Sequence, residues 1–130
     1  MILDTSFLID LFDGREDAFQ KGLELSDAGM VQRIPSPVVT ELSYGSSFDD
    51  QEERRKVRNA LRMYPVVEQD ETTAQHAGEL LACADKDGGG ESGVGKVDAM
   101  IGAVGDIYDE PVLTNNTDDF EALGVEVESY

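Results

Sequence analysis

The stretch Met1-Ile2-Leu3-Asp4-Thr5-Ser6 decides how this chain is interpreted, because an apolar run ends there in a carboxylate. The first four residues predict a short strand. The polar side chains of Thr5 and Ser6 suit the start of a helix that continues to Phe12. A carboxylate at the tip of a buried strand loses water and needs a compensating partner. Asp4 is therefore the first candidate functional residue.

Three more acids occupy similar positions far apart in the sequence. Glu41 follows Ser-Pro-Val-Val-Thr, Asp98 precedes Ala-Met-Ile-Gly-Ala, and Asp119 follows Val-Leu-Thr-Asn-Asn-Thr-Asp. Sites in parallel sheets form beyond the carboxyl ends of the strands, so these side chains are expected to converge. Converging carboxylates are usually compensated by a hard cation such as Mg²⁺ or Mn²⁺. With 28 Asp and Glu in the chain, any one of them could instead be a helix cap or a solvated acid.

Strand and helix signals alternate along the whole chain. Strands are expected at residues 1–4, 30–34, 65–67, 112–114 and 125–128. Helices are expected at residues 7–12, 16–28, 38–44, 51–63, 71–85, 97–108 and 119–123. This alternation predicts a three-layer α/β fold with a mainly parallel, five-stranded sheet flanked by helices. No repeat or linker is visible, so residues 1–130 are expected to form a single domain.

The charge of the chain is strongly negative, with a net value of −18 and a pI of about 4.1. One explanation is a protein that avoids nucleic acid, because phosphate contacts need Lys and Arg. The other is adaptation to a salt-rich cytoplasm, where screening weakens self-repulsion and an acidic surface keeps the chain soluble. The acids are spread over the whole chain and lysine is scarce, which favours the halophile explanation. Acidity alone therefore does not exclude an RNA substrate.

Compartment signals point to a cytoplasmic protein. Cys83 is the only cysteine, which rules out an internal disulfide and suits a reducing environment. Cys83 itself is expected to be a small buried apolar residue rather than a nucleophile. No apolar run is long enough to span a bilayer, and no signal peptide is visible.

Four segments together resemble the PIN-domain family of endoribonucleases, most closely its VapC-type toxins. They are Ile2-Leu3-Asp4-Thr5-Ser6, Pro37-Val38-Val39-Thr40-Glu41-Leu42-Ser43-Tyr44-Gly45, Val97-Asp98-Ala99-Met100-Ile101-Gly102-Ala103 and Val112-Leu113-Thr114-Asn115-Asn116-Thr117-Asp118-Asp119-Phe120. They follow the family's order and nearly its spacing. The resemblance implies a Mg²⁺ or Mn²⁺ site, cleavage of single-stranded RNA, a homodimer and a cognate antitoxin partner.

The resemblance also assigns roles to particular residues. Asp4, Glu41 and Asp98 would be the core acids and Asp119 the fourth, with Asp4, Asp98 and Asp119 as metal ligands. Glu41 could bind metal or orient a water as general base. Supporting positions would be Ser6, Thr114, Asn115 and Asp118. Ser6 stands where Asn is common in the family, and Asn115 stands where some members carry an acid. Asp118 therefore competes with Asp119 for the role of fourth acid.

Basic residues gather in one predicted helix, where Arg54, Arg58 and Arg62 follow one another at four-residue spacing. These arginines could be a solvated face paired with nearby acids such as Glu52 and Glu53. They could also contact an RNA backbone or dock an acidic partner segment.

Two further features are explained without a catalytic role. Gly90-Glu91-Ser92-Gly93-Val94-Gly95-Lys96 matches the core of a phosphate-binding loop, but a helix precedes it and Val97 replaces the required Ser or Thr. A flexible loop is expected there, with Lys96 able to approach RNA phosphates. His76, the only histidine, is expected on the surface.

The leading hypothesis from the sequence is a metal-dependent endoribonuclease that serves as the toxin of a type II toxin–antitoxin pair. Two related alternatives are an RNA-processing nuclease and a PIN-fold RNA- or protein-binding module without activity. A phosphatase with an aspartyl nucleophile is disfavoured, because Asp4-Thr5-Ser6 lacks a second Asp two residues after the first.

Overall fold

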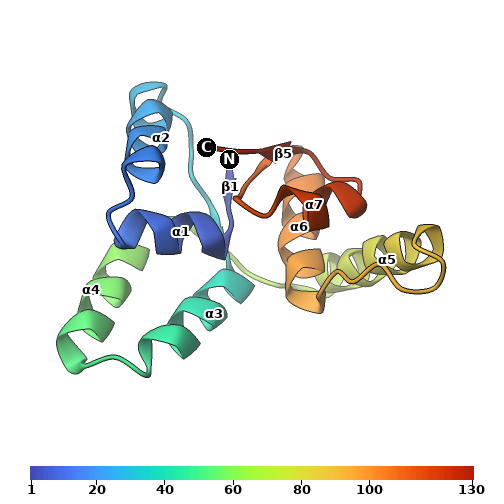
Figure 1. Ribbon diagram of the computed structural model, residues 1–130, viewed down its shortest axis with the longest axis horizontal. Coiled ribbons are helices and arrows are strands. Elements are labelled where there is room, and N and C mark those ends of the chain that lie inside the picture. The colour runs from blue at the N-terminus through green and yellow to red at the C-terminus, as the bar shows by residue number, and fades with distance from the viewer.

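The computed structural model describes residues 1–130 and has seven helices around five short parallel strands (Figure 1). The strands are β1 (Ile2–Leu3), β2 (Ile34–Pro35), β3 (Val66–Val67), β4 (Val112–Leu113) and β5 (Val127–Glu128). The helices are α1 (Thr5–Phe12), α2 (Glu16–Asp27), α3 (Ser36–Ser46), α4 (Gln51–Leu61), α5 (Glu71–Asp87), α6 (Lys96–Tyr108) and α7 (Thr117–Ala122). Every predicted helix and strand therefore exists, with boundaries that differ by a few residues.

The strands form a three-stranded sheet in the order β1-β4-β5 and a two-stranded sheet that pairs β2 with β3. A parallel bridge between Ile2 and Arg33 joins the two sheets. The combined order is β3-β2-β1-β4-β5, with β1 at the centre. The expected five-stranded parallel sheet is therefore present in approximate form.

The central strands are buried on both faces, as parallel strands covered by helices should be. Ile2, Leu3, Ile34, Val112 and Leu113 are completely inaccessible to solvent. In Figure 1, α1 to α4 lie on one side of these strands, and α5, α6 and α7 lie on the other. The three-layer arrangement expected from the sequence is confirmed.

The second strand differs from its prediction. Residues 30–34 were expected to be extended, but only Ile34 and Pro35 pair as β2. Met30 and Val31 are exposed, because the chain here crosses the surface after Gly29 (φ 66°) ends α2. Pro35 closes the strand, where its missing N–H is not needed for the ladder.

One burial expectation is wrong. Cys83 is exposed, because α5 packs on α6 through Ala77 and Ala84 instead. Phe19 and Leu23 of α2 and Tyr44 of α3 are also exposed, although they are large apolar residues. His76 lies on α5 as expected and is only partly exposed, since its ring bonds the carboxylate of Asp106. None of the helices combines the length and hydropathy needed to cross a membrane.

Helix α6 runs through the middle of the molecule, and its small residues allow close approach to the sheet. Gly102 and Gly105 are buried. A Cβ added at Gly105 would lie 2.9 Å from Cγ2 of Val112 and 3.0 Å from the carbonyl oxygen of Glu110. Contacts this short are not tolerated without movement of the backbone. The glycine therefore sets the distance between α6 and β4, and so the position of the segment that follows β4.

Replacement of Gly105 by Ala is expected to lower the free energy of unfolding by about 1–3 kcal/mol, because the added methyl overpacks the helix–strand contact. Gly78→Ala is the matched control: its Cβ would meet nothing within 4 Å on the exposed face of α5. That substitution should raise the free energy of unfolding by about 0.5–1 kcal/mol. Urea unfolding of the two variants measures both effects, and equal effects would contradict the close packing described here.

Candidate active site

The side chain of Asp4 is the most buried carboxylate of the site, and it is held by two hydroxyl groups. Asp4 as a whole is only 5% exposed. Ser6 Oγ and Thr114 Oγ1 each donate a hydrogen bond of 2.7 Å to Asp4 Oδ2. Asp4 occupies the N-cap position of α1, but its side chain makes no capping bond. The carboxylate therefore points to the end of β4 rather than back onto its own helix.

The segment after β4 is fixed beside Asp4 by its own hydrogen bonds. The backbone N–H of Asn115 donates to Ser6 Oγ over 3.2 Å, and that of Asn116 donates to Thr114 Oγ1 over 2.9 Å. The Asn116 side chain donates to Asp119 Oδ2 over 2.6 Å. Asp119 is thus positioned by an amide close to the carboxyl end of β4.

Glu41 reaches the site from α3. Thr5 Oγ1 donates to Glu41 Oε1 over 2.6 Å, which ties the second residue after β1 to the middle of α3. Glu41 is half-buried, so this bond fixes a carboxylate that would otherwise sample several rotamers. Strand β1 therefore organises two of the four predicted acids, Asp4 directly and Glu41 through Thr5.

Asp98 lies in the first turn of α6, and its environment shows that the four acids share one site. The pKa of Asp98 is raised from 3.8 to about 6, first by burial and then by the negative charges of Asp4, Asp119 and Glu41. Like charges close together and partly withdrawn from water disfavour ionisation. Residues separated by up to 115 positions in the sequence (Asp4 to Asp119) thus lie close enough to Asp98 for their charges to act on it.

The remaining predicted site residues lie in different surroundings. Asp118 is exposed and is not among the carboxylates that raise the pKa of Asp98. Lys96 is the exposed first residue of α6, two positions before Asp98. The glycine-rich segment before Lys96 follows helix α5 rather than a strand, so it is not a phosphate-binding loop of the NTPase type.

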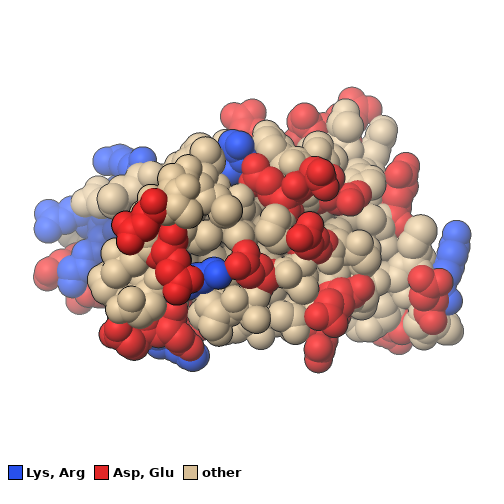
Figure 2. All heavy atoms as spheres, turned by 90° about the horizontal axis from the view of Figure 1, so that it is seen from above, with Lys and Arg blue, Asp and Glu red and all other residues tan.

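The arginines of α4 are not part of the acid cluster. Arg54, Arg58 and Arg62 line a groove between α3 and α4. The alternative in which they pair with Glu52 and Glu53 is not observed, because only Lys56 forms ion pairs with those two acids. In Figure 2, much of the visible Lys and Arg gathers at the end of the molecule where Figure 1 places α4, whereas Asp and Glu are spread over the rest of this face.

The sequence did not reveal a second polar cluster around Asp10. Tyr130 donates to Asp10 Oδ2 over 2.6 Å, and the Asn115 side chain donates to the same oxygen over 3.0 Å. The Tyr130 ring also packs edge-on against Phe7, with 5.1 Å between centroids. Asp10 therefore links α1 to both the site and the last residue of the chain. The only feature of the sequence that pointed to this cluster was the position of Asp10 on the first helix, about one and a half turns after Asp4.

The donor set fits a hard divalent cation in its chemistry. Carboxylate oxygens are the ligands that Mg²⁺ and Mn²⁺ prefer, and Oδ1 of Asp4 is left without a hydrogen bond because both hydroxyls go to Oδ2. A cation would also offset the repulsion that raises the pKa of Asp98. No group of three or more His, Cys, Asp and Glu side chains is close enough to form a ready-made ligand cage. Carboxylate rotamers would therefore have to move towards a bound ion.

Comparison with known proteins places this fold and site in a family. The PIN domain matches residues 1–126, so the chain belongs to the PIN domain family. A search of curated proteins finds no match. Three similar solved structures are VapBC2 from Rickettsia felis bound to a promoter DNA fragment, DNA-bound VapBC from Salmonella typhimurium and FitAcB from Neisseria gonorrhoeae.

These three structures share the fold with this chain at low sequence identity. The Rickettsia protein is 20% identical with a TM-score of 0.81, covering 99% of this chain and 97% of its own. The Salmonella protein is 23% identical with a TM-score of 0.79 and coverage of 98% and 96%. The Neisseria protein is 20% identical with a TM-score of 0.76 and coverage of 97% and 94%. The resemblance to PIN domains noted in the sequence is confirmed, and the chain shares its fold with these VapBC and FitAcB structures.

The raised pKa of Asp98 predicts a specific pH dependence of stability without added metal. Protonation of Asp98 is favoured in the folded chain, so the wild type gains stability from this group as pH falls from about 7 to about 4. Asp98→Asn removes the charge at every pH. The variant should therefore be more stable than wild type at neutral pH, and its advantage should shrink through this window. Urea unfolding over the pH range measures the difference, and a constant difference would contradict the prediction.

Removal of the Tyr130 hydroxyl tests the Asp10 cluster. Tyr130→Phe keeps the ring on Phe7 but deprives the Asp10 carboxylate of a donor, which is expected to lower the free energy of unfolding by about 1.5–3 kcal/mol. Tyr44→Phe is the control, since Tyr44 is 70% exposed and its hydroxyl has no partner in the protein. Thermal unfolding distinguishes them. Equal midpoints for both variants would show that the hydroxyl of Tyr130 contributes nothing.

Proposed function

We propose that this protein is a metal-dependent endoribonuclease that hydrolyses phosphodiester bonds in single-stranded RNA, and that it is the toxin of a type II toxin–antitoxin pair. The observation that carries the proposal is the half-buried Asp98, whose pKa is raised first by burial and then by the charges of the three other carboxylates beside it. Clusters of mutually repelling carboxylates destabilise a fold and are retained where function requires them. Family membership and the VapBC-like fold support the assignment.

In this proposal Asp4, Asp98 and Asp119 hold Mg²⁺ or Mn²⁺, and Glu41 orients a water as general base or adds a ligand. A bound cation supplies Lewis-acid stabilisation of the phosphate and lowers the pKa of bound water. Ser6 and Thr114 fix Asp4 through Oδ2 and leave Oδ1 available. Thr5 fixes Glu41. Asp119 is preferred to Asp118 as the fourth acid. Asp118 is exposed, and its charge is not among those that raise the pKa of Asp98.

Supporting residues would act on the substrate and on the partners. Asn115 holds Ser6 through its backbone and Asp10 through its side chain, and so keeps the end of β4 in register with α1. Lys96 is exposed two residues before Asp98, where it could approach an RNA phosphate. The toxin proposal includes a cognate antitoxin and a homodimer, as suggested by complexes whose fold this chain shares. The net charge of −18 supports a salt-rich working environment.

The decisive test is cleavage of a mixed single-stranded RNA pool in high KCl with Mn²⁺. Wild type should cleave, and Asp98→Asn or Asp119→Asn should fall to the level of a reaction without enzyme, because each removes a proposed ligand. Asp118→Asn is the matched control: it removes the same charge one residue away and should retain activity. Gel analysis of the fragments is the measurement.

Metal binding is measured on the same proteins. Mn²⁺ should bind wild type and Asp118→Asn in a fixed ratio and bind Asp98→Asn much more weakly. Equal cleavage by wild type and Asp98→Asn would indicate a contaminating nuclease and count against the assignment. Stoichiometric metal binding without cleavage would point to a binding module or to a substrate missing from the pool.

A further inference from the structure

Helix α4 and Arg62, the residue that follows it, carry five of the ten basic residues of the chain, and four of the five have no acidic partner. Arg54, Arg55, Arg58 and Arg62 form no ion pair within the protein. Elsewhere Arg15, Lys21 and Arg33 are paired with acids, as is Lys56 within α4, whereas Lys86 and Lys96 stand alone. In a chain with 28 acidic residues, a row of unpaired arginines is not explained by internal electrostatics.

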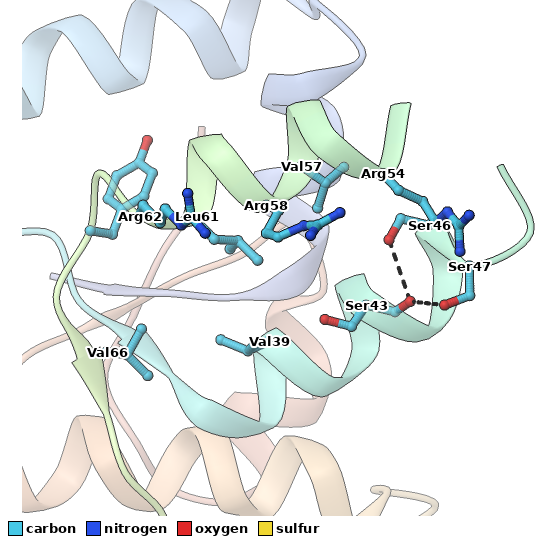
Figure 3. A pocket seen from close by; sticks show the side chains of 11 residues that line it. Val39, Ser43, Ser46, Ser47, Arg54, Val57, Arg58, Leu61, Arg62 and Val66 are labelled. Atoms are coloured by element: carbon cyan, nitrogen blue, oxygen red, sulfur yellow. Dashed lines mark hydrogen bonds between the residues drawn. The ribbon is translucent and has the colours of Figure 1, made fainter. Parts of the chain in front are cut away.

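Three of these arginines border a groove between α3 and α4 with a volume of about 420 Å³ (Figure 3). The groove also has an apolar lining, contributed by α3, α4 and the segment around β3. Its apolar members are Val39, Val57, Leu61, Tyr64 and Val66. Figure 3 shows Val39 and Val66 on the opposite side of the groove from the α4 side chains. The surface thus combines an aliphatic floor with a cationic rim.

The arginines are spaced one helical turn apart. Arg54, Arg58 and Arg62 therefore follow one stripe that is about 12 Å long. Carboxylates placed one turn apart on a second helix would match this spacing, with apolar residues on the same helix directed to the floor. Arginine forms bidentate bonds with carboxylates, so each position can add orientation as well as attraction.

The groove opens on the face of α3 that is turned away from Glu41. Val39 and Ser43 line it, and each is about 200° around the α3 axis from Glu41. Glu41 lines a neighbouring cavity with Ile9 and Phe12 of α1, and this cavity shares only Ser46 and Val57 with the groove. The lining has a single aromatic ring, that of Tyr64, among four aliphatic side chains. It therefore lacks the row of aromatic rings on which successive bases of a single strand stack.

We propose that the α3–α4 groove binds an acidic amphipathic segment of a protein partner, with carboxylates on Arg54, Arg58 and Arg62 and apolar side chains on the valine and leucine floor. The proposal deepens the partner part of the proposed function, but its test uses no RNA cleavage, so either can fail alone. At long range, the net charge of −18 repels acidic chains. Only a segment that reaches the arginines and the apolar floor together is retained. High salt removes the long-range repulsion and leaves the short-range contacts.

The experiment is selection from a random peptide library displayed on phage, panned on the whole protein in high KCl. Peptides enriched on wild type should carry acids at four-residue spacing with apolar residues between them. One enriched peptide is then synthesised and titrated by fluorescence anisotropy. The double variant Arg58→Glu with Arg62→Glu should weaken its binding by at least about tenfold, because two attractions become repulsions.

The matched control is Lys56→Glu with Lys86→Glu, which changes the net charge by the same amount on exposed positions outside the groove. Its affinity for the peptide should stay within about twofold of wild type, because neither lysine lines the groove and charges outside it are screened in salt. Val66→Thr tests the floor without changing charge: Val66 is 46% exposed, so the fold should survive and binding should weaken by a few-fold. Circular dichroism checks that each variant is folded.

Three outcomes would overturn the proposal. The enriched peptides could lack acidic residues, or bind the Arg58→Glu, Arg62→Glu protein as well as wild type. Polyuridylate could bind wild type and be lost with the same double variant while no acidic peptide is selected, which would assign the groove to RNA. Finally, the double variant could convert a dimer to a monomer in light scattering, which would assign the groove to a second copy of the chain.

Discussion

The burial of one carboxylate organises this molecule. Asp4 sits at the end of the central strand and is almost inaccessible to water, so its charge has to be met by donors inside the protein. The donors are Ser6, the second residue of α1, and Thr114, at the end of the neighbouring strand. These bonds hold the first helix and the segment after β4 against the same oxygen. The other acids are arranged around this centre, since Thr5 holds Glu41 and the 115–119 segment carries Asp119.

Hydrogen bonds stabilise the acid cluster, and repulsion between its own negative charges destabilises it. Hydroxyl and amide donors satisfy individual carboxylates, but no basic side chain pairs with Asp4, Glu41, Asp98 or Asp119. The raised pKa of Asp98 reflects its burial together with this uncompensated negative charge. Basic side chains are instead used elsewhere, and four of them are collected on α4. This separation of charge gives the molecule an electronegative site and a distinct electropositive groove.

The sequence predicted the order of elements and the four acids, because both depend on local patterns. Apolar runs that end in Asp or Asn mark strand ends, and the parallel topology brings those ends together. The errors have a different origin. Cys83 was expected to be buried but is exposed, because burial depends on which neighbour covers a helix face, and the local sequence does not specify the neighbour. The Asp10–Tyr130 bond and the α3–α4 groove were missed for the same reason, since each joins segments that no local signal connects.

The bond between Asp4 and Thr114 joins positions 110 residues apart, and β1 pairs with β4 over the same separation. During translation, the first strand therefore leaves the ribosome long before its partner has been made. Asp4, Glu41 and Asp98 are all synthesised before the segment that completes their surroundings. The acid cluster can therefore assemble only after residue 119 has left the ribosome, and until then its first three carboxylates remain separate from one another's final surroundings.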